Sequence, residues 1–336
     1  MRRGLSTAVL PGLLIGAALG ACSSSPAPVR PPVGAVGATQ PAPAAPSSVP
    51  TTFGPGTTAA ASPEPPATTA APVGPCAGTA PPGRYDRVVW IWMENHTDVL
   101  ASGAAAYERG VAAACGAGTN DADVGSPSLP NYLGATSGST WGVGDDSGPG
   151  SHPIAADNLF RQVRAAGGTE RSYEEAMPAP CTLGSTGRYA VKHNPAAYYV
   201  GGNDRAACES DDVPLAGAFA HDIAAGTLPM FSFVTPDLCD DTHDCGIGTG
   251  DAWLAQWLAR VLDGPQYRDG RTAVFVVWDE PTPMAELVMA PSVVPGTTVT
   301  VRTDHYALLR TTEELLGLPL LGRAATAVDL RPLYHL

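Results

Sequence analysis

Acidic side chains follow three apolar runs of the sequence, in each case where a buried strand would end. Glu94 and Asn95 follow the run in RVVWIWMEN, Asp279 and Glu280 follow that in TAVFVVWDE, and Asp237 closes LPMFSFVTPD. Open parallel sheets place their ligand sites at the carboxyl ends of strands, and hard divalent cations take oxygen ligands. An acid can also end a strand simply because the chain reaches water there. Three such ends, one with paired carboxylates, favour one shared cation site.

A serine suited to nucleophilic attack lies in SPSLPNYLGATSG. Ser128 precedes a Leu-Pro-Asn turn that is expected to open a helix, and the free N–H groups and positive dipole end of a helix N-terminus suit phosphate. A serine there can attack phosphorus, with its alkoxide bound to a metal. Serine is also a favoured helix N-cap, and this stretch taken alone favours that plainer role.

The loop PDLCDDTHDCGIGTGD combines five acids with His243. Oxygen ligands at this density suggest a divalent cation, although the loop is not an EF-hand, because its third position is Cys239 and its twelfth is Gly248. A solvated acidic loop held by a disulfide is an equal alternative. Two further histidines, His193 in VKHNP and His305 in TDHYALL, are either site residues or ordinary half-buried side chains.

Strand-like and helix-like stretches alternate around these residues. Strands are expected over 87–94, within 228–237, from Thr272 and over 286–291. Helices are expected near 101–114, over 251–263 with Asp251 as the N-cap, and from Asp304 to Gly317. The alternation predicts an α/β fold in one catalytic domain, with a mostly parallel central sheet between helices. Such a sheet would bring the strand-end acids to one edge.

The N-terminal quarter of the chain has a different composition. Residues 1–22 read as a signal peptide whose LGAC ending resembles a lipobox, so we expect Cys22 to be lipidated; an ordinary cleaved signal is the alternative. Residues 23–82 are rich in Pro, Ala, Thr and Ser and predict a disordered tether. Residues 83–336 have the size of one α/β domain. The expected product is an exported protein, anchored to the bacterial membrane outside the cytoplasm.

Seven cysteines become six once Cys22 is lipidated, and an even number in an exported chain predicts disulfides. Proximity in sequence suggests the pairs Cys76–Cys115, Cys181–Cys208 and Cys239–Cys245. A zinc site is the rival interpretation, but no C-x-x-C spacing occurs.

The net charge of −13 also limits the partners. An acidic surface is a poor match for nucleic acid, and clustered carboxylates would repel an anionic substrate unless a cation lies among them. No G-x-S-x-G elbow, Walker A motif or dinucleotide fingerprint is present.

Six stretches in this order resemble a known family. They are VVWIWMENHTD, SPSLPNYLGATSG, YAVKHNP, DDTHDCGIGTGDAWL, VFVVWDE and HYALLRTTEELLGLP. The chain is similar to the bacterial phosphoesterase family of secreted acid phosphatases and phospholipases C, within the alkaline phosphatase superfamily. Its short single-domain form is most similar to mycobacterial members that act on a phosphoinositide. The resemblance implies an alkaline-phosphatase-like fold and a phosphoric ester hydrolase.

The resemblance also implies roles for individual residues. It makes Ser128 the nucleophile and Asn131 a group that orients a phosphoryl oxygen. His243 matches a position facing the phosphate or leaving group, and we expect it to be the acid that protonates the leaving oxygen. One divalent metal ion, whose identity the resemblance does not specify, would bind Glu94, Asn95, Asp279 and Glu280. Positions facing the phosphate or leaving group would be His193, Asp241, Asp244 and His305.

The expected function is metal-dependent hydrolysis of phosphoric monoesters through a phosphoserine. The expected partners are a small phosphorylated substrate or a phospholipid headgroup and, through Cys22, a membrane, for a protein that acts as a monomer. A phospholipase C and a non-catalytic, calcium-stabilised surface lipoprotein are the alternatives. Two departures from the family leave substrate choice open: Ser126-Pro127-Ser128 replaces His-Pro-Ser, and the loop PTPMA after Glu280 is short.

Overall fold

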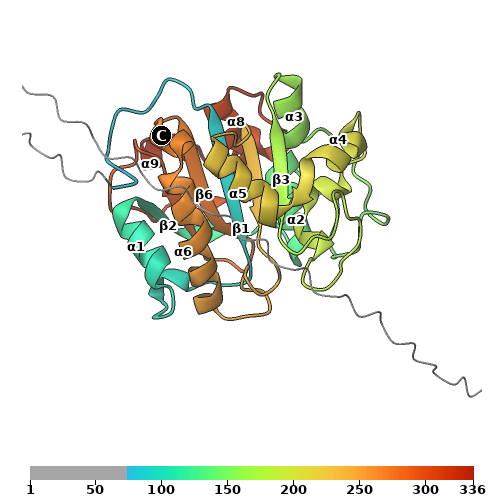
Figure 1. Ribbon diagram of the computed structural model, residues 1–336, viewed down its shortest axis with the longest axis horizontal. Coiled ribbons are helices and arrows are strands. Elements are labelled where there is room, and N and C mark those ends of the chain that lie inside the picture. The colour runs from blue at the N-terminus through green and yellow to red at the C-terminus, as the bar shows by residue number, and fades with distance from the viewer. Residues whose placement is uncertain (1–73) are drawn as a thin grey trace, which may run out of the picture. The chain divides into compact units, whose positions relative to one another are not determined.

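A nine-stranded sheet organises residues 74–336, the part of the chain that this computed structural model describes (Figure 1). The strand order is β4-β3-β5-β1-β6-β7-β2-β8, with β9 beside β2. Neighbouring strands are parallel except at β7, which is antiparallel to both β6 and β2. The strands are β1 (Arg87–Met93), β2 (Gly116–Ala122), β3 (Glu170–Glu174), β4 (Asp212–Pro214), β5 (Phe231–Thr235), β6 (Thr272–Trp278), β7 (Met284–Met289), β8 (Thr297–Val299) and β9 (Thr303–Asp304).

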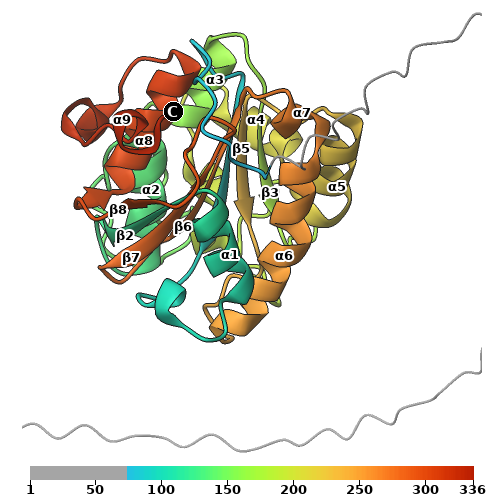
Figure 2. The ribbon, with the colours of Figure 1, turned by 90° about the vertical axis from the view of Figure 1, so that its left-hand side faces the viewer.

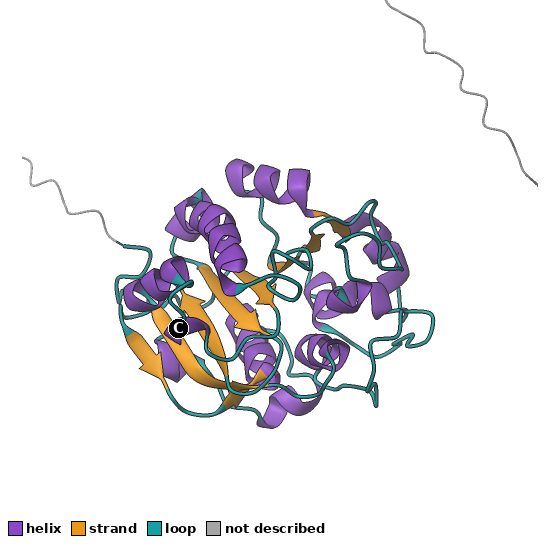
Figure 3. Cartoon of the chain, turned by 90° about the horizontal axis from the view of Figure 1, so that it is seen from below, coloured by secondary structure: helices purple, strands orange, loops and turns teal. Residues whose placement is uncertain are grey.

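Helices cover both faces of this sheet. Figure 2 shows α2 and α8 on one face and α1, α5 and α6 on the other, and Figure 3 shows the same layering from below. The predicted α/β class, with a mostly parallel sheet between helices, is therefore confirmed. The helices are α1 (Ala106–Ala114), α2 (Ser128–Ser137), α3 (Leu159–Ala165), α4 (Asp204–Asp211), α5 (Leu215–Ala225), α6 (Ile247–Asp263), α7 (Pro265–Arg268), α8 (His305–Leu316) and α9 (Arg331–Tyr334), with 3₁₀ turns at Val99–Ala101, Val191–His193, Pro195–Tyr198 and Gly322–Thr326.

The central strands are apolar on both faces because both faces are covered. Every residue of β6 is buried, as is every residue of β1 after Arg87. Trp90 packs edge-on against Phe231, and its indole N–H donates a hydrogen bond to Thr312 Oγ1 of α8 at 3.0 Å. Trp92 stacks on Phe233. These aromatic contacts tie β1 to β5 and to the helix layer above it.

The structure corrects the expected start of one helix. Asp251 was expected to cap a helix over 251–263, but α6 begins four residues earlier, at Ile247, with Gly246 as its N-cap. The Asp251 carboxylate instead accepts the backbone N–H groups of Tyr107 and Glu108 at 3.1 and 2.9 Å. These N–H groups belong to the first turn of α1 and have no acceptor within that helix. Asp251 therefore provides hydrogen-bond acceptors for a neighbouring helix rather than capping its own.

Other boundaries also shift. The helix expected near 101–114 is a 3₁₀ turn followed by α1, and the strand expected over 286–291 is β7. The helix expected from Asp304 to Gly317 is confirmed as α8. Its N-cap, Asp304, accepts the N–H of Ala307 at 2.9 Å, and its C-cap, Gly317, is left-handed with φ 68°.

The segment 74–82 lies against the domain. Cys76 is buried and forms a disulfide with Cys115, and the Ala77 N–H donates to the Pro291 carbonyl at 3.1 Å. The other disulfides are Cys181–Cys208 and Cys239–Cys245, so all three pairs are those suggested by proximity in sequence.

Two further expectations concern the remainder of the chain and the membrane. The expected signal peptide, Cys22 and residues 23–73 of the expected tether lie outside the described residues. Within residues 74–336, none of the helices has both the length and the apolar character needed to cross a bilayer.

Candidate active site

The register of β1 and β6 brings two acids together. Met93 pairs with Trp278, so the residues that follow, Glu94 and Asp279, leave the sheet side by side. The Asp279 N–H donates to the Met93 carbonyl at 3.1 Å and continues the ladder by one step. Both side chains are completely buried. The ends of β1 and β6 therefore place two buried carboxylates side by side.

Asn95 and Glu280 differ from these two acids. Asn95 adopts a left-handed conformation with φ 48°, which asparagine tolerates. Its N–H donates to Asp279 Oδ1 at 3.2 Å, and the Glu280 N–H donates to the same oxygen at 2.6 Å. The Glu280 side chain is partly exposed and forms no hydrogen bond or ion pair within residues 74–336. The backbone of these two residues therefore orients Asp279 Oδ1.

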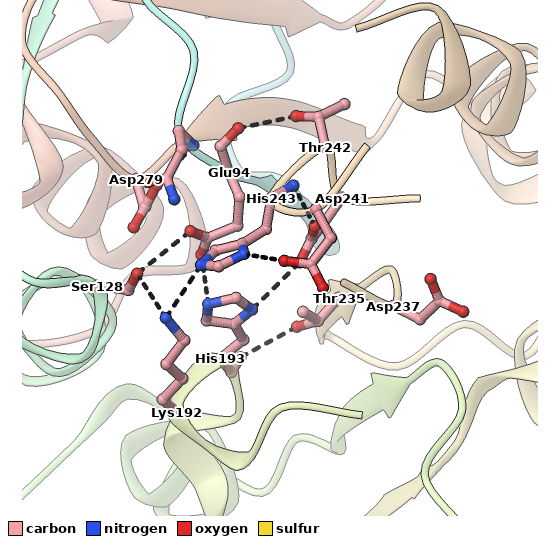
Figure 4. Close-up of polar contacts among 12 residues, drawn as sticks. Glu94, Ser128, Lys192, His193, Thr235, Asp237, Asp241, Thr242, His243 and Asp279 are labelled. Atoms are coloured by element: carbon pink, nitrogen blue, oxygen red, sulfur yellow. Dashed lines mark hydrogen bonds and ion pairs between the residues drawn. The ribbon is translucent and has the colours of Figure 1, made fainter. Parts of the chain in front are cut away.

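The acidic loop after β5 supplies a third carboxylate. Asp241 is fully buried, and its carbonyl accepts the Glu94 N–H at 2.8 Å. The His193 ring lies between the two acids, with Nε2 3.1 Å from Glu94 Oε1 and Nδ1 3.2 Å from Asp241 Oδ2 (Figure 4). Asp237, which ends the third strand-like run, does not join this group. Its Oδ1 accepts the N–H groups of Cys239 and Asp240 in its own loop.

Tight backbone packing holds the loop that carries Asp241. Thr242 has φ 79°, a costly conformation for a β-branched residue. Its hydroxyl donates to the Glu94 carbonyl at 2.8 Å. Gly250 of α6 lies against this turn, where a Cβ atom would come within 2.4 Å of Thr242 Cγ2. The absent side chain at Gly250 allows α6 to press the loop onto the end of β1.

Burial sets the electrostatics of this cluster. Burial, together with the Asp279 and Asp241 carboxylates, raises the pKa of Glu94 well above its usual range. Burial likewise raises the pKa of Asp241 to about 8 and that of Asp279 to about 7. Burial and the neighbouring Lys192 lower the pKa of His193 well below its usual value, despite the two nearby carboxylates. Packing three acids around a neutral imidazole is unfavourable without a compensating cation.

The donor atoms fit a divalent cation. Asp279 Oδ2 and Asp241 Oδ2 are buried and lack an aligned hydrogen-bond donor within residues 74–336. Ligand atoms of Glu94, His193 and His243 all lie within 4.8 Å of one another. Carboxylate oxygens with one or two imidazole nitrogens form the usual donor set of catalytic divalent metals.

Ser128 is the first residue of α2 and lies at the rim of this cluster. Its hydroxyl donates to Glu94 Oε2 at 3.3 Å, and its side chain is buried. Tyr132, one turn further along α2, hydrogen-bonds to Glu94 Oε1 and stacks on the His193 ring at 5.3 Å. The helix therefore presents both the Ser128 hydroxyl and a group that holds the central acid.

Asn131 holds the backbone that precedes Ser128. Its Oδ1 accepts the N–H groups of Val124 and Gly125 at 2.9 and 3.0 Å, while its Nδ2 is buried and has no partner within the described residues. One end of the amide therefore shapes the loop before Ser128. The other end remains available to an acceptor.

The structure adds two residues that the sequence analysis did not select. Lys192 Nζ lies 3.5 Å from Ser128 Oγ, 3.1 Å from Asp146 Oδ2 and 3.2 Å from His243 Nε2 (Figure 4). Asp146 Oδ1 also accepts the Leu129 N–H at 3.0 Å. The sequence signal for Lys192 was its place in VKHNP beside His193. Asp146 lies in a Gly-rich loop and carried no such signal.

The remaining predicted residues lie at different depths. His243 is partly exposed, and its Nδ1 lies 2.7 Å from Asp244 Oδ1. His305 is completely buried, and its Nε2 lies 2.7 Å from the Asp279 carbonyl. The structure thus places His243 and Asp244 at the mouth of the site and His305 behind Asp279.

Comparisons with known proteins identify the family of the chain. The model of the Phosphoesterase family matches residues 122–308, more than half of the chain. Two curated relatives are similar. A phosphatidylinositol-3-phosphatase from Mycobacterium tuberculosis is 32% identical over 60% of this chain and 66% of the relative. An acid phosphatase from Aspergillus fumigatus is 27% identical over 71% of this chain and 56% of the relative. The chain thus spans less than two thirds of the length of these relatives.

A solved structure shows the same fold. A protein of the alkaline phosphatase superfamily from Vibrio parahaemolyticus superposes with a TM-score of 0.50 and 12% identity, covering 77% of this chain and 73% of that one. At this identity the likeness concerns the fold alone.

Proposed function

This chain belongs to the phosphoesterase family, and we propose that it hydrolyses phosphoric monoesters in a metal-dependent reaction through a phosphoserine at Ser128. The observation that carries the proposal is the position of the Ser128 hydroxyl. It lies at a helix N-terminus, 3.3 Å from Glu94 in a cluster of buried acids, and 3.5 Å from the Lys192 ammonium. A nucleophile, a cation-binding cluster and an anion-binding helix end meet at this point.

The proposed cation site consists of Glu94, Asp279 and Asp241, with His193 as a nitrogen ligand, which leaves His243 for proton transfer. Asn95 and Glu280, which the family resemblance adds, would support Asp279 or complete the set. When bound, a divalent cation would supply positive charge that favours the alkoxide of Ser128 and the charge on the phosphoryl oxygens.

The chain's own residues then divide the reaction between them. Ser128 Oγ attacks phosphorus in line, and Glu94 Oε2, which already accepts its hydrogen bond, lies where the hydroxyl proton leaves. As the Oγ–P bond forms, the bond from phosphorus to the ester oxygen breaks. His243 gives that oxygen a proton, and Asp244 Oδ1, 2.7 Å from Nδ1, orients the ring. Water then gives a proton to His243 and its oxygen attacks phosphorus. The bond from phosphorus to Oγ breaks, Oγ takes back the proton that left toward Glu94, and inorganic phosphate is released.

The test is Ser128→Ala, assayed with para-nitrophenyl phosphate. Loss of a nucleophile commonly costs several orders of magnitude in rate, so we expect at least a thousandfold loss with folding unchanged. Acid-quenched wild-type protein should carry a phosphoryl group on Ser128 that mass spectrometry detects. Ser151→Ala, at an exposed serine, is the matched control. A variant with more than about a tenth of the wild-type rate, a barrier change under roughly 1.4 kcal/mol, would exclude Ser128 as the nucleophile.

A phospholipase C activity is the second candidate. A cavity of about 170 Å³ lies beside the segments that follow β1 and β6, lined in part by Leu100, Ala101 and Met284. Thr97, Asp98 and Thr119 also line this cavity, and the apolar part of the lining is the observation that favours a lipid substrate. Release of phosphocholine from phosphatidylcholine, with no turnover of para-nitrophenyl phosphate, would establish this alternative.

The setting of the reaction is also a proposal. Three disulfides within residues 74–336 favour an oxidising compartment outside the cytoplasm. We place the protein there as a lipid-anchored monomer, attached through Cys22. Globomycin, which blocks processing of lipidated precursors, should then cause the unprocessed chain to accumulate.

A further inference from the structure

Lys192 is held where a phosphoryl group would form on Ser128. The ammonium donates to Asp146 Oδ2 at 3.1 Å, and the other Asp146 oxygen accepts the N–H of Leu129, the residue after the nucleophile. The Lys192 side chain is only 20% exposed. Its position is therefore fixed relative to the start of α2 before any substrate binds, which is the preorganisation that charge stabilisation requires.

The charges around Ser128 Oγ are unequal. Within residues 74–336, the charged groups that contact this atom are the Glu94 carboxylate at 3.3 Å and the Lys192 ammonium at 3.5 Å. Behind Glu94 lie Asp241 and Asp279, so the cluster is acidic on that side. Lys192 supplies side-chain positive charge beside the same hydroxyl (Figure 4).

We propose that Lys192 determines specificity by reading the second negative charge of a phosphomonoester, a charge that a phosphodiester lacks. This inference rests on the proposed function. Because phosphorus bonds to Ser128 Oγ, its nonbridging oxygens lie one bond from phosphorus, and a group that reaches Oγ also reaches them. In a diester one of these oxygens carries an organic group instead of charge. Charge-assisted hydrogen bonds are the stronger kind, so the dianion gains more from the ammonium.

A structural role for Lys192 is the competing explanation. The Asp146 pair could serve only to fix the loop 139–150 against α2. A structural role predicts an equal loss for every substrate, because a displaced Ser128 attacks all of them poorly. A charge-reading role predicts a loss that depends on the charge of the substrate. The two roles are therefore distinguished by the ratio of the rates on two substrates of different charge, and not by the rate on either substrate alone.

The experiment compares two substrates with the same leaving group, para-nitrophenyl phosphate and bis(para-nitrophenyl) phosphate. For Lys192→Ala we expect kcat/KM to fall about 100- to 1,000-fold for the monoester, as when one oxyanion donor is removed, and less than about tenfold for the diester. Lys192→Arg, which keeps the charge, should recover at least a tenth of the wild-type preference. Arg188→Ala removes a cation four residues away that is 62% exposed, and should leave the preference unchanged.

A second measurement does not depend on turnover. Inorganic phosphate should raise the unfolding midpoint of wild-type protein, and about tenfold more phosphate should be needed for the same rise in Lys192→Ala. Equal losses on both substrates, or unchanged phosphate protection, would overturn the role of Lys192 while leaving the proposed function intact. If wild-type protein turned over neither substrate, the proposed function would fail, and the inference with it.

Discussion

At the scale of single residues, the site is organised around Glu94. One of its oxygens receives the Ser128 hydroxyl, and the other lies against Tyr132 and the His193 ring. Its buried position at the end of β1 could be predicted, because an apolar run followed by an acid marks the carboxyl end of a core strand. The parts played by Tyr132 and Lys192 could not, because a tyrosine in a helix and a lysine in a turn have many ordinary uses.

Asp279 and Glu280 are adjacent in sequence but unequal in the structure. Asp279→Asn removes a buried charged oxygen from the proposed cation site, so cation affinity should fall at least about tenfold, the loss that even outer partners of metal sites produce. Excess cation should restore part of the rate. The measurement is the unfolding midpoint of chelator-treated protein during titration with Mg²⁺, Ca²⁺, Mn²⁺ or Zn²⁺.

The matched control for this prediction is Asp263→Asn, which changes an exposed acid at the end of α6. Glu280→Gln separates the two members of the acidic pair, and we expect a smaller effect because its side chain is partly exposed. Cation titration curves for Asp279→Asn that coincide with those of wild type would exclude Asp279 from the site.

At the scale of elements, the prediction of a helix start failed where a side chain of one helix accepts the free N–H groups of another. Asp251 has the position of a helix N-cap in the sequence, yet it accepts the free N–H groups of α1 from inside α6. Sequence patterns record local spacing and cannot show which neighbouring helix needs a capping group. By contrast, Asp304 and Gly317 cap their own helix, α8, and both ends were predicted correctly.

The same contact between α1 and α6 buries an unusual acid. Glu108 of α1 is 1% exposed, and neither side-chain oxygen has a hydrogen-bond partner within residues 74–336. Burial and the Asp251 carboxylate raise the pKa of Glu108 to about 8. The unfolded chain ionises this group near pH 4.3. Between these two pH values Glu108 is protonated in the folded state and ionised in the unfolded chain. The free energy of unfolding therefore falls as pH rises from about 4 to about 8.

Glu108→Gln should remove this loss, because glutamine does not ionise. Relative to wild type, the variant should gain roughly 1–3 kcal/mol in the free energy of unfolding between pH 5 and pH 8. Urea unfolding at the two pH values measures the change, and Glu209→Gln, at an exposed position on α4, is the control. A difference between variant and wild type that is the same at both pH values would show that Glu108 does not titrate in this range.

At the scale of the whole molecule, strand order was the part of the fold that the sequence did not reveal. The parallel strands β5, β1 and β6 lie side by side although the chain visits them far apart, and β7 enters antiparallel between β6 and β2. Local patterns identify strands, but the pairing of strands depends on which faces the intervening helices cover. The carboxyl ends of parallel strands lie at one edge of the sheet. The convergence of Glu94 and Asp279 could therefore be predicted without knowing the strand order.

The first described residues contribute to the stability of the whole domain. Besides the Cys76–Cys115 disulfide, the Tyr267 hydroxyl donates to the Pro75 carbonyl at 2.7 Å, and the Gly78 N–H donates to the Val293 carbonyl at 3.0 Å. These contacts lie before residue 83, where the change in composition placed the expected start of the domain. Two shortened chains, one starting at Gly74 and one at Gly83, therefore distinguish the contribution of the expected tether from that of residues 74–82.

The chain that starts at Gly74 should keep kcat/KM and its unfolding midpoint, because the removed Pro- and Ala-rich residues have a composition that cannot form a core. The chain that starts at Gly83 leaves Cys115 unpaired. Closing a loop of this separation, 39 residues, contributes about 4 kcal/mol in the chain-entropy description. We expect the midpoint to fall by roughly 5–12 °C. A full-length Cys76→Ser/Cys115→Ser variant isolates the disulfide, and should account for most of that fall. If the Gly74 chain failed to fold, residues before Gly74 would belong to the domain; if the Gly83 chain matched wild type, the contacts of residues 74–82 would contribute nothing measurable.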